Sequence, residues 1–152
     1  MAEEYTVRVL ARDGKEFLWS RKKARRAKTL ANMMDDASDD TLPVLLTATV
    51  LATLGPMLEP EYEPQDLGAH SVATLVELVE GANHLDAPQA LEHLQRALAA
   101  RLAGKRADEL RMLLGATEDF TGAEERAAAL AEPCFTPVAD REYAKKDNTV
   151  QE

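Results

Sequence analysis

The sequence contains few of the residues from which disulfides and metal sites are built. Cys134 is the only cysteine among 152 residues, so one chain can form neither an intramolecular disulfide nor a cysteine-based zinc cluster. The three histidines are His70, His84 and His93, and no spacing between them brings two imidazoles together as a metalloprotease motif does. We therefore expect no metal ion and no cofactor.

Aromatic residues and long apolar runs are also scarce. Aromatics make up 5% of the chain, so leucine, valine and alanine must fill most of the core. No segment approaches the roughly 20 consecutive apolar residues that span a bilayer, and residues 1–10 are acidic, without the apolar run of a signal peptide. We expect no membrane partner and a reducing intracellular compartment, either cytoplasm or nucleus.

Basic residues are outnumbered, 18 against 27 acidic ones, which gives a formal net charge of −9. This balance argues against a nucleic-acid partner, because such binding depends largely on phosphate neutralisation. The one basic run, residues 21–26 (RKKARR), is typical of a nuclear-import or polyanion-binding segment. The interpretation we favour is a solvated helix face balanced by the acidic residues at 35–40.

Local patterns predict a mixed α/β unit in the first half of the chain. Residues 5–10 (YTVRVL) alternate as a half-buried strand does, and Asp13-Gly14 is a turn that joins this strand to a partner at 17–19. The other expected elements are a helix at 21–34, an acidic loop at 35–40, an edge strand at 42–46 containing Pro43, a helix at 47–54 that stops at Gly55-Pro56, and a mobile loop at 59–68.

The second half is predicted to be helical. Ser71 is a candidate N-cap for a helix that reaches Leu85, and Asp86 a candidate N-cap for the next, with Pro88 in its first turn. Gly104 is predicted to end that second helix, and Gly115 to end a further helix at 107–114. A capping box at 121–124 is predicted to begin a last helix, which runs to about Leu130. Beyond residue 138 a polar, disordered tail is expected.

A leucine stripe in the second of these helices needs an explanation. It consists of Leu91, Leu94, Leu98 and Leu102, and the helices that follow contain little bulky apolar material. Such short elements cannot bury all their leucines against one another. Either the β-containing half covers the stripe or a partner protein does.

Residues 81–86 (GANHLD) raise the possibility of an enzyme, because His84 lies between two helices. It could be a catalytic group, a buried structural histidine or a surface group that meets another protein. Cys134 with a histidine could form a nucleophile pair, but Cys134 follows Pro133 near the chain end, where nothing lowers a thiol pKa. A small Cys/His hydrolase is therefore the alternative, and we expect no enzyme activity.

Three segments, in order and at matching spacing, resemble the S-phase-kinase-associated adaptor family of Skp–cullin–F-box ubiquitin ligases. Residues 74–86 (TLVELVEGANHLD) match the pattern T-L-x-E-L-hydrophobic-x-x-A-N-aromatic-L-D, with His84 in the aromatic position. Residues 104–111 (GKRADELR) match G-K-x-x-x-E-hydrophobic-R, and residues 118–125 (EDFTGAEE) resemble N-D-F-T-x-x-E-E. Residues 13–17 and Leu42-Pro43 agree more loosely, so the resemblance covers roughly residues 5 to 132.

The resemblance implies an α/β (α+β) fold of the BTB/POZ type, with a small sheet and helices, followed by a helical extension that binds F-box proteins. It divides the chain into residues 1–70 and 71–103, both BTB/POZ-like, an F-box-binding extension at 104–135, and the tail at 136–152. The sequence departs from the family at Gly55-Pro56, which are predicted to break a helix that the family continues.

The same resemblance implies an adaptor that links F-box proteins to a cullin N-terminal domain by protein contacts alone, in the cytoplasm and nucleus. Asn83 and His84 would contact the cullin. The F-box side would be formed by Leu98, Leu102, Leu110 and Phe120. A competitor of the same fold, which binds only one of the two partners and inhibits ligase assembly, is the alternative within this family.

Overall fold

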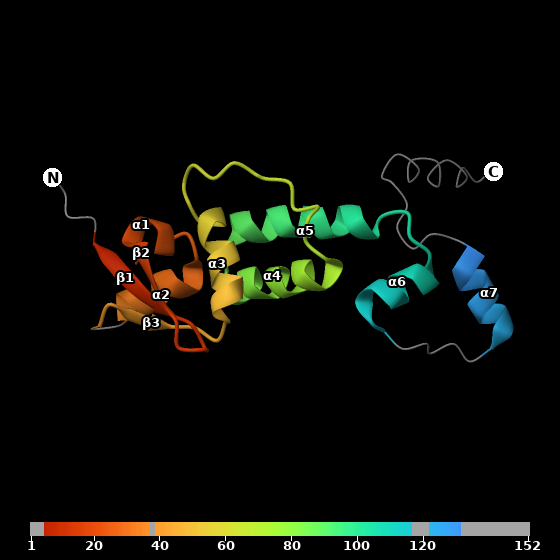
Figure 1. Cartoon of the computed structure of the whole chain (residues 1–152), viewed down its shortest axis with the longest axis horizontal. Helices are drawn as coiled ribbons and strands as arrows, with labels where there is room; N and C mark the ends of the chain where they lie inside the picture. Colours follow the sequence, from red (N-terminus) through yellow and green to blue (C-terminus); the bar gives the residue numbers. More distant parts are fainter. Residues whose placement is uncertain (1–4, 37–38, 117–121, 132–152) are drawn as a thin grey trace, which may run out of the picture. The chain divides into compact units, whose positions relative to one another are not determined.

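A computed structural model describes residues 5–36, 39–116 and 122–131 of the chain (Figure 1). Its internal contacts divide the chain into two compact units, residues 1–97 and residues 98–152, and each is described by itself. The first unit contains a mixed three-stranded sheet and most of the helices, so the α/β class expected from the sequence is confirmed. The second contains the end of one helix and two further helices.

The sheet has the strand order β2-β1-β3 and is built from β1 (Thr6–Leu10), β2 (Glu16–Ser20) and β3 (Thr41–Pro43). β1 and β2 form the predicted antiparallel hairpin, and Gly14 in its turn has φ +89. β1 and β3 are parallel. Pro43 lies on an edge strand, as predicted, because proline cannot donate to a ladder. The strand is shorter than the predicted 42–46 and ends at Pro43.

The single helix predicted at 21–34 is wrong, because the segment forms α1 (Arg21–Ala24) and α2 (Lys28–Asp36). The Ser20 hydroxyl accepts a hydrogen bond from the N–H of Lys23 at 3.2 Å and begins α1. The break has a tertiary cause. The N–H groups of Lys28 and Thr29 bond carbonyls of residues 86 and 85 instead of the preceding turn.

The helix α3 (Ala48–Met57) passes through Gly55 and Pro56, so the predicted stop before them is wrong. Pro56 lies in the last turn of α3, so its ring and its missing N–H disturb only the end of the helix. Gly55 is buried against the indole of Trp19: a Cβ at residue 55 would lie 3.3 Å from Trp19 Cζ2. This close contact favours glycine there without ending the helix.

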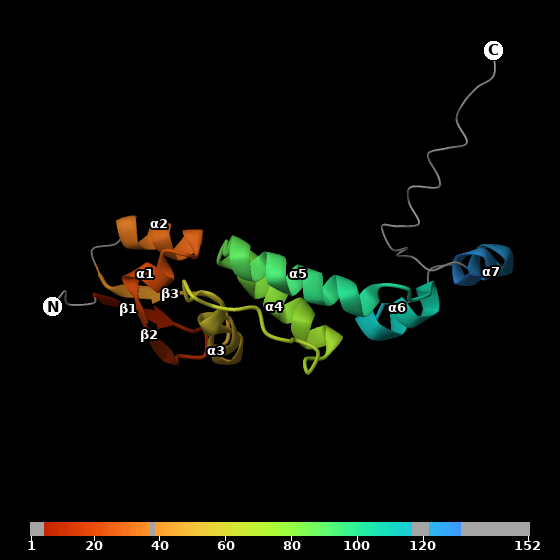
Figure 2. The same ribbon diagram turned by 90° about the horizontal axis from the view of Figure 1, so that it is seen from above.

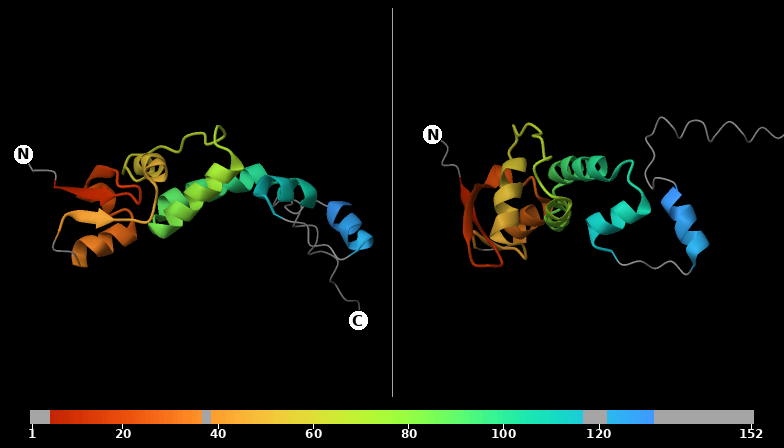
Figure 3. Two further views of the ribbon diagram at one scale, coloured as in Figure 1. Left: turned by 60° about the horizontal axis from the view of Figure 1, so that its bottom comes forward. Right: turned by 45° about the vertical axis from the view of Figure 1, so that its right-hand side comes forward.

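The hairpin turn is tied to the start of α3. The Asp13 carboxylate accepts a hydrogen bond from the N–H of Ala48 at 3.0 Å, and the Thr47 hydroxyl accepts one from Val50 at 3.4 Å. Both bonds satisfy N–H groups that lack a partner within the helix. In Figures 1 and 3, α3 lies between the sheet and the next helix, α4 (Val72–His84).

Within the first unit, α4 runs beside the first part of α5 (Pro88–Leu102), which follows it in the opposite direction (Figures 1 and 2). Ser71 is the N-cap of α4, as predicted, and its hydroxyl accepts a hydrogen bond from the N–H of Thr74 at 3.1 Å. Leucine dominates the core, as the composition predicts. The most deeply buried leucines are Leu30, Leu42, Leu51, Leu54, Leu58, Leu75, Leu78, Leu85 and Leu94.

The second unit contains the end of α5, then α6 (Ala107–Leu114) and α7 (Ala123–Ala131), and α6 contacts α7. Gly104 (φ +72) follows the end of α5, and Gly115 (φ +65) closes α6, as both were predicted to do. The capping residue Thr121 and the tail at 136–152 lie outside the described residues. Among the helices that the structure describes, none is long and apolar enough to cross a membrane.

Candidate functional site

The corner between α4 and α5 is closed by Asp86 in a left-handed conformation, with φ +50. The N–H of Ala87 donates to the carbonyl of Ala82, and the N–H of Asp86 donates to that of Asn83, both at 3.0 Å. This pair of bonds is a Schellman motif, in which Asp86 occupies the position that glycine usually takes. The prediction that Asp86 is the N-cap of α5 is therefore wrong: Asp86 ends α4.

The backbone carbonyl groups of this corner accept hydrogen bonds from the start of α2. The N–H groups of Lys28 and Thr29 donate to the carbonyls of Asp86 and Leu85, at 3.0 and 3.1 Å. The Thr29 hydroxyl donates to the carbonyl of His84 at 2.9 Å. The C-terminus of α4 thus meets the N-terminus of α2, which pairs opposite ends of two helix dipoles. These bonds fix the backbone of the corner.

The structure brings the two predicted cullin-binding residues together on the surface. Asn83 and His84 are both exposed, whereas the next residue, Leu85, is completely buried. His84 is therefore not a buried structural histidine. With its backbone carbonyl held by Thr29, the imidazole belongs to a fixed, solvent-facing corner that a second protein can contact.

A groove of about 410 Å³ lies beside His84, between α4 and the loop from β3 to α3. Its walls are formed by Arg12, Leu45, Leu46, Thr47, Val50, Glu77, Glu80, Gly81 and His84. Leu45 is 72% exposed. Leu45 is not among the predicted site residues, because it lies inside the strand predicted at 42–46, whereas β3 ends two residues before it.

The predicted F-box-binding residues differ in exposure. Leu98 and Leu102 are half-buried, and Leu110 is only 9% exposed. Phe120 lies outside the described residues. The three residues after Arg111 are not among the predicted contact residues, yet Met112 is 85% exposed, and Leu113 and Leu114 are also exposed. Together these three residues form an apolar end of α6, which we call the α6 apolar patch.

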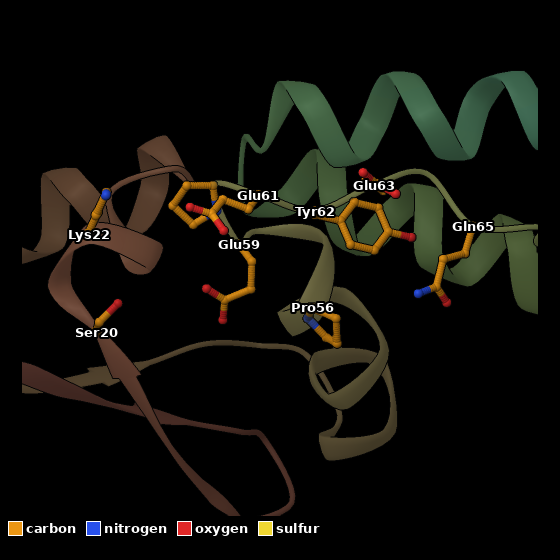
Figure 4. Close-up of a pocket in the computed structure, with 9 residues that line it drawn as sticks. Ser20, Lys22, Pro56, Glu59, Glu61, Tyr62, Glu63 and Gln65 are labelled. Atoms are coloured by element: carbon orange, nitrogen blue, oxygen red, sulfur yellow. The ribbon is translucent and has the colours of Figure 1, made fainter.

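A second hollow, of about 580 Å³, lies next to the acidic loop at 59–68 (Figure 4). Figure 4 shows Ser20 and Lys22 on one side and Pro56, Tyr62 and Gln65 on the other.

The loop at 59–68 is predicted to be mobile, yet it has contacts with the rest of the first unit. Its Leu67 is buried, and the ring of Tyr62 meets that of His93 edge-on, with 6.0 Å between the ring centroids. Three exposed glutamates make the hollow acidic: Glu59, Glu61 and Glu63.

The basic run at 21–26 is largely occupied by internal partners. Arg21 and Arg25 form ion pairs with Asp40 and Asp35, at 3.0 and 2.9 Å. Lys23 pairs with Glu59 at 2.8 Å, and Arg26 donates to the side-chain carbonyl of Gln89. The predicted balance of the run by acidic residues at 35–40 is thus confirmed for Arg21 and Arg25, whereas only residues 21–24 of the run form a helix.

The described residues contain no group of three His, Cys, Asp or Glu side chains placed to hold a metal ion. Cys134, the candidate nucleophile of the hydrolase hypothesis, lies outside them. The described surface carries exposed apolar side chains at two places, in the groove beside His84 and in the α6 apolar patch.

A scan against protein-family models finds no match to this sequence, and a search of curated proteins finds no similar sequence.

Proposed function

We propose that this chain is an F-box adaptor of a Skp–cullin–F-box ubiquitin ligase, with a BTB/POZ-like first unit, and that it acts by protein contacts alone. One observation carries the proposal: two of the three family-like segments, one in each unit, present exposed residues at the surface. Residues 74–86 form α4 and the His84 corner, and residues 104–111 lead into the α6 apolar patch. Such an adaptor would act in the cytoplasm and nucleus.

The cullin side of the proposal is supported by the rigidity of the corner. A partner that docks on Asn83 and His84 meets side chains whose backbone is already held by the Schellman motif and by α2. Little conformational entropy is then lost on binding. The groove beside His84 adds the exposed apolar side chain of Leu45 to the same surface.

The F-box side is supported by apolar side chains that the second unit does not bury. Met112, Leu113 and Leu114 are exposed, and Leu98 and Leu102 are only half-buried. Exposed apolar patches favour association, because each Å² removed from water contributes about 25 cal/mol. Partner helices that cover them would complete the core of this extension. Leu110, being buried, would support α6 from inside.

The proposal is tested by pull-down of the full chain with a cullin N-terminal domain and with an F-box protein, first separately and then together. An adaptor binds each partner and recovers both in one complex. Binding to a single partner would instead identify the competitor that inhibits ligase assembly. Binding to neither partner would reject both functions.

A further inference from the structure

We propose that the groove beside His84 binds a partner helix with a leucine or aromatic anchor side chain and a lysine or arginine on the edge that faces α4. This inference deepens the proposed function, since the groove adjoins the proposed cullin-facing corner, and it rests on that function only for the identity of the partner. The groove itself is defined by residues of the first unit.

The apolar anchor follows from the floor of the groove. Gly81 is buried there, and a Cβ at this position would lie 2.7 Å from Val50 Cγ1 and 3.1 Å from Leu54 Cδ1. At Gly81 the helices α3 and α4 are therefore in close contact, and Gly81 adds no polar side chain to the lining of the groove. Leu46 and Val50 line the same groove, and Leu45 projects beside them, 72% exposed. A hollow of about 410 Å³ has room for a leucine or an aromatic ring.

The basic edge follows from the charges of α4. Glu77 and Glu80 lie one turn apart, both are exposed, and both line the groove next to Gly81 and His84. Neither forms an ion pair with another described residue, in contrast to Asp35, Asp40 and Glu59. Two unpaired carboxylates on one wall attract a cation and repel an acidic helix.

The groove also carries one positive charge. Arg12 lines it on the hairpin side, so a partner helix is attracted most when its basic edge faces α4 and an acidic or neutral edge faces Arg12. This arrangement sets the orientation of the helix as well as its composition. Since both walls are exposed to solvent, the charge selection weakens as salt rises.

The test is a helical library displayed on phage and selected against the full chain. Its central position is Leu, Phe or Ser, and its flanking positions are Lys, Glu or Gln. We expect enrichment of Leu or Phe with Lys on one edge. In fluorescence anisotropy, Glu77→Lys with Glu80→Lys should weaken binding of an enriched peptide by about tenfold. The matched control, Glu61→Lys with Glu63→Lys, makes the same charge change at the other hollow and should leave binding within about twofold.

Two results would overturn the inference: a selection without excess of Lys, and peptide binding that the Glu77 and Glu80 changes do not weaken more than the control. The cullin N-terminal domain is measured in parallel. If it binds the wild-type chain and the double variant equally, the assignment of the groove to a cullin fails while the proposed function stands. If the peptides behave as expected and the cullin domain does not bind, the groove stands and its assignment to a cullin fails.

Discussion

At the scale of single residues, Asp86 ends the helix before it instead of beginning the helix after it. An aspartate two residues before a proline is typical of an N-cap, yet Asp86 has φ +50 and closes the preceding helix. Aspartate is among the few L-residues that tolerate this conformation. This turn holds Asn83 and His84 at the surface, where we propose that they contact a partner protein.

We predict that Asp86→Gly keeps or raises stability, by up to about 1 kcal/mol, because glycine adopts positive φ without steric cost. Gln95→Gly, at an exposed position inside α5, is the control and should lose about 1 kcal/mol. Urea unfolding at an unchanged m-value measures both. If Asp86→Gly lost as much as the control, the left-handed cap would not be the role of this residue.

At the scale of elements, the segments that were predicted correctly are those fixed by their own sequence. The Asp13-Gly14 hairpin, the Ser71 cap and the Gly115 stop each depend on hydrogen bonds or backbone angles within a few residues. The errors have tertiary causes. Lys28 and Thr29 bond the distant corner, which divides α1 from α2, and Trp19 packs on Gly55, where α3 continues. Leu45 could not be placed on the site, because the end of β3 is set by its pairing with β1.

The contact between α3 and α4 depends on the absence of a side chain at Gly81. We predict that Gly81→Ala destabilises the chain by about 1 kcal/mol, because overpacking costs about 1–3 kcal/mol and the gain in helix propensity returns about 1 kcal/mol. In a Val50→Ala background the atom at 2.7 Å is removed, so Gly81→Ala should there be neutral or stabilising. Thermal unfolding of the four proteins measures this coupling, and equal effects in both backgrounds would contradict it.

The ion pairs around the basic run predict a polyanion response. Asp35→Asn with Asp40→Asn removes the partners of Arg25 and Arg21, so the double variant should elute from heparin at higher salt than the wild type. Asp66→Asn with Asp108→Asn makes the same net-charge change elsewhere and should shift elution less. Equal shifts for the two double variants would show that total charge, rather than a released basic surface, controls retention.

At the scale of the whole molecule, the two proposed surfaces belong to two separate compact units. The His84 corner and its groove lie in residues 1–97, and the α6 apolar patch lies in residues 98–152. Sites in separate units that share no side chains are expected to respond to substitution independently. An adaptor needs this property, since each partner must bind whether or not the other is present.

We therefore predict a crossed pattern of losses. His84→Asp should weaken binding to the cullin N-terminal domain by about tenfold or more and leave F-box binding within about twofold, while Met112→Asp should do the reverse. Gln95→Asp and Ala99→Asp, at exposed positions of α5, are the matched controls for an added carboxylate. Isothermal titration with each partner gives the affinities, and thermal unfolding checks that His84→Asp folds normally, as expected for an exposed side chain.

If either variant weakened the binding of both partners equally while its melting temperature stayed unchanged, the two surfaces would not be independent. The chain would then bind both partners through one shared site.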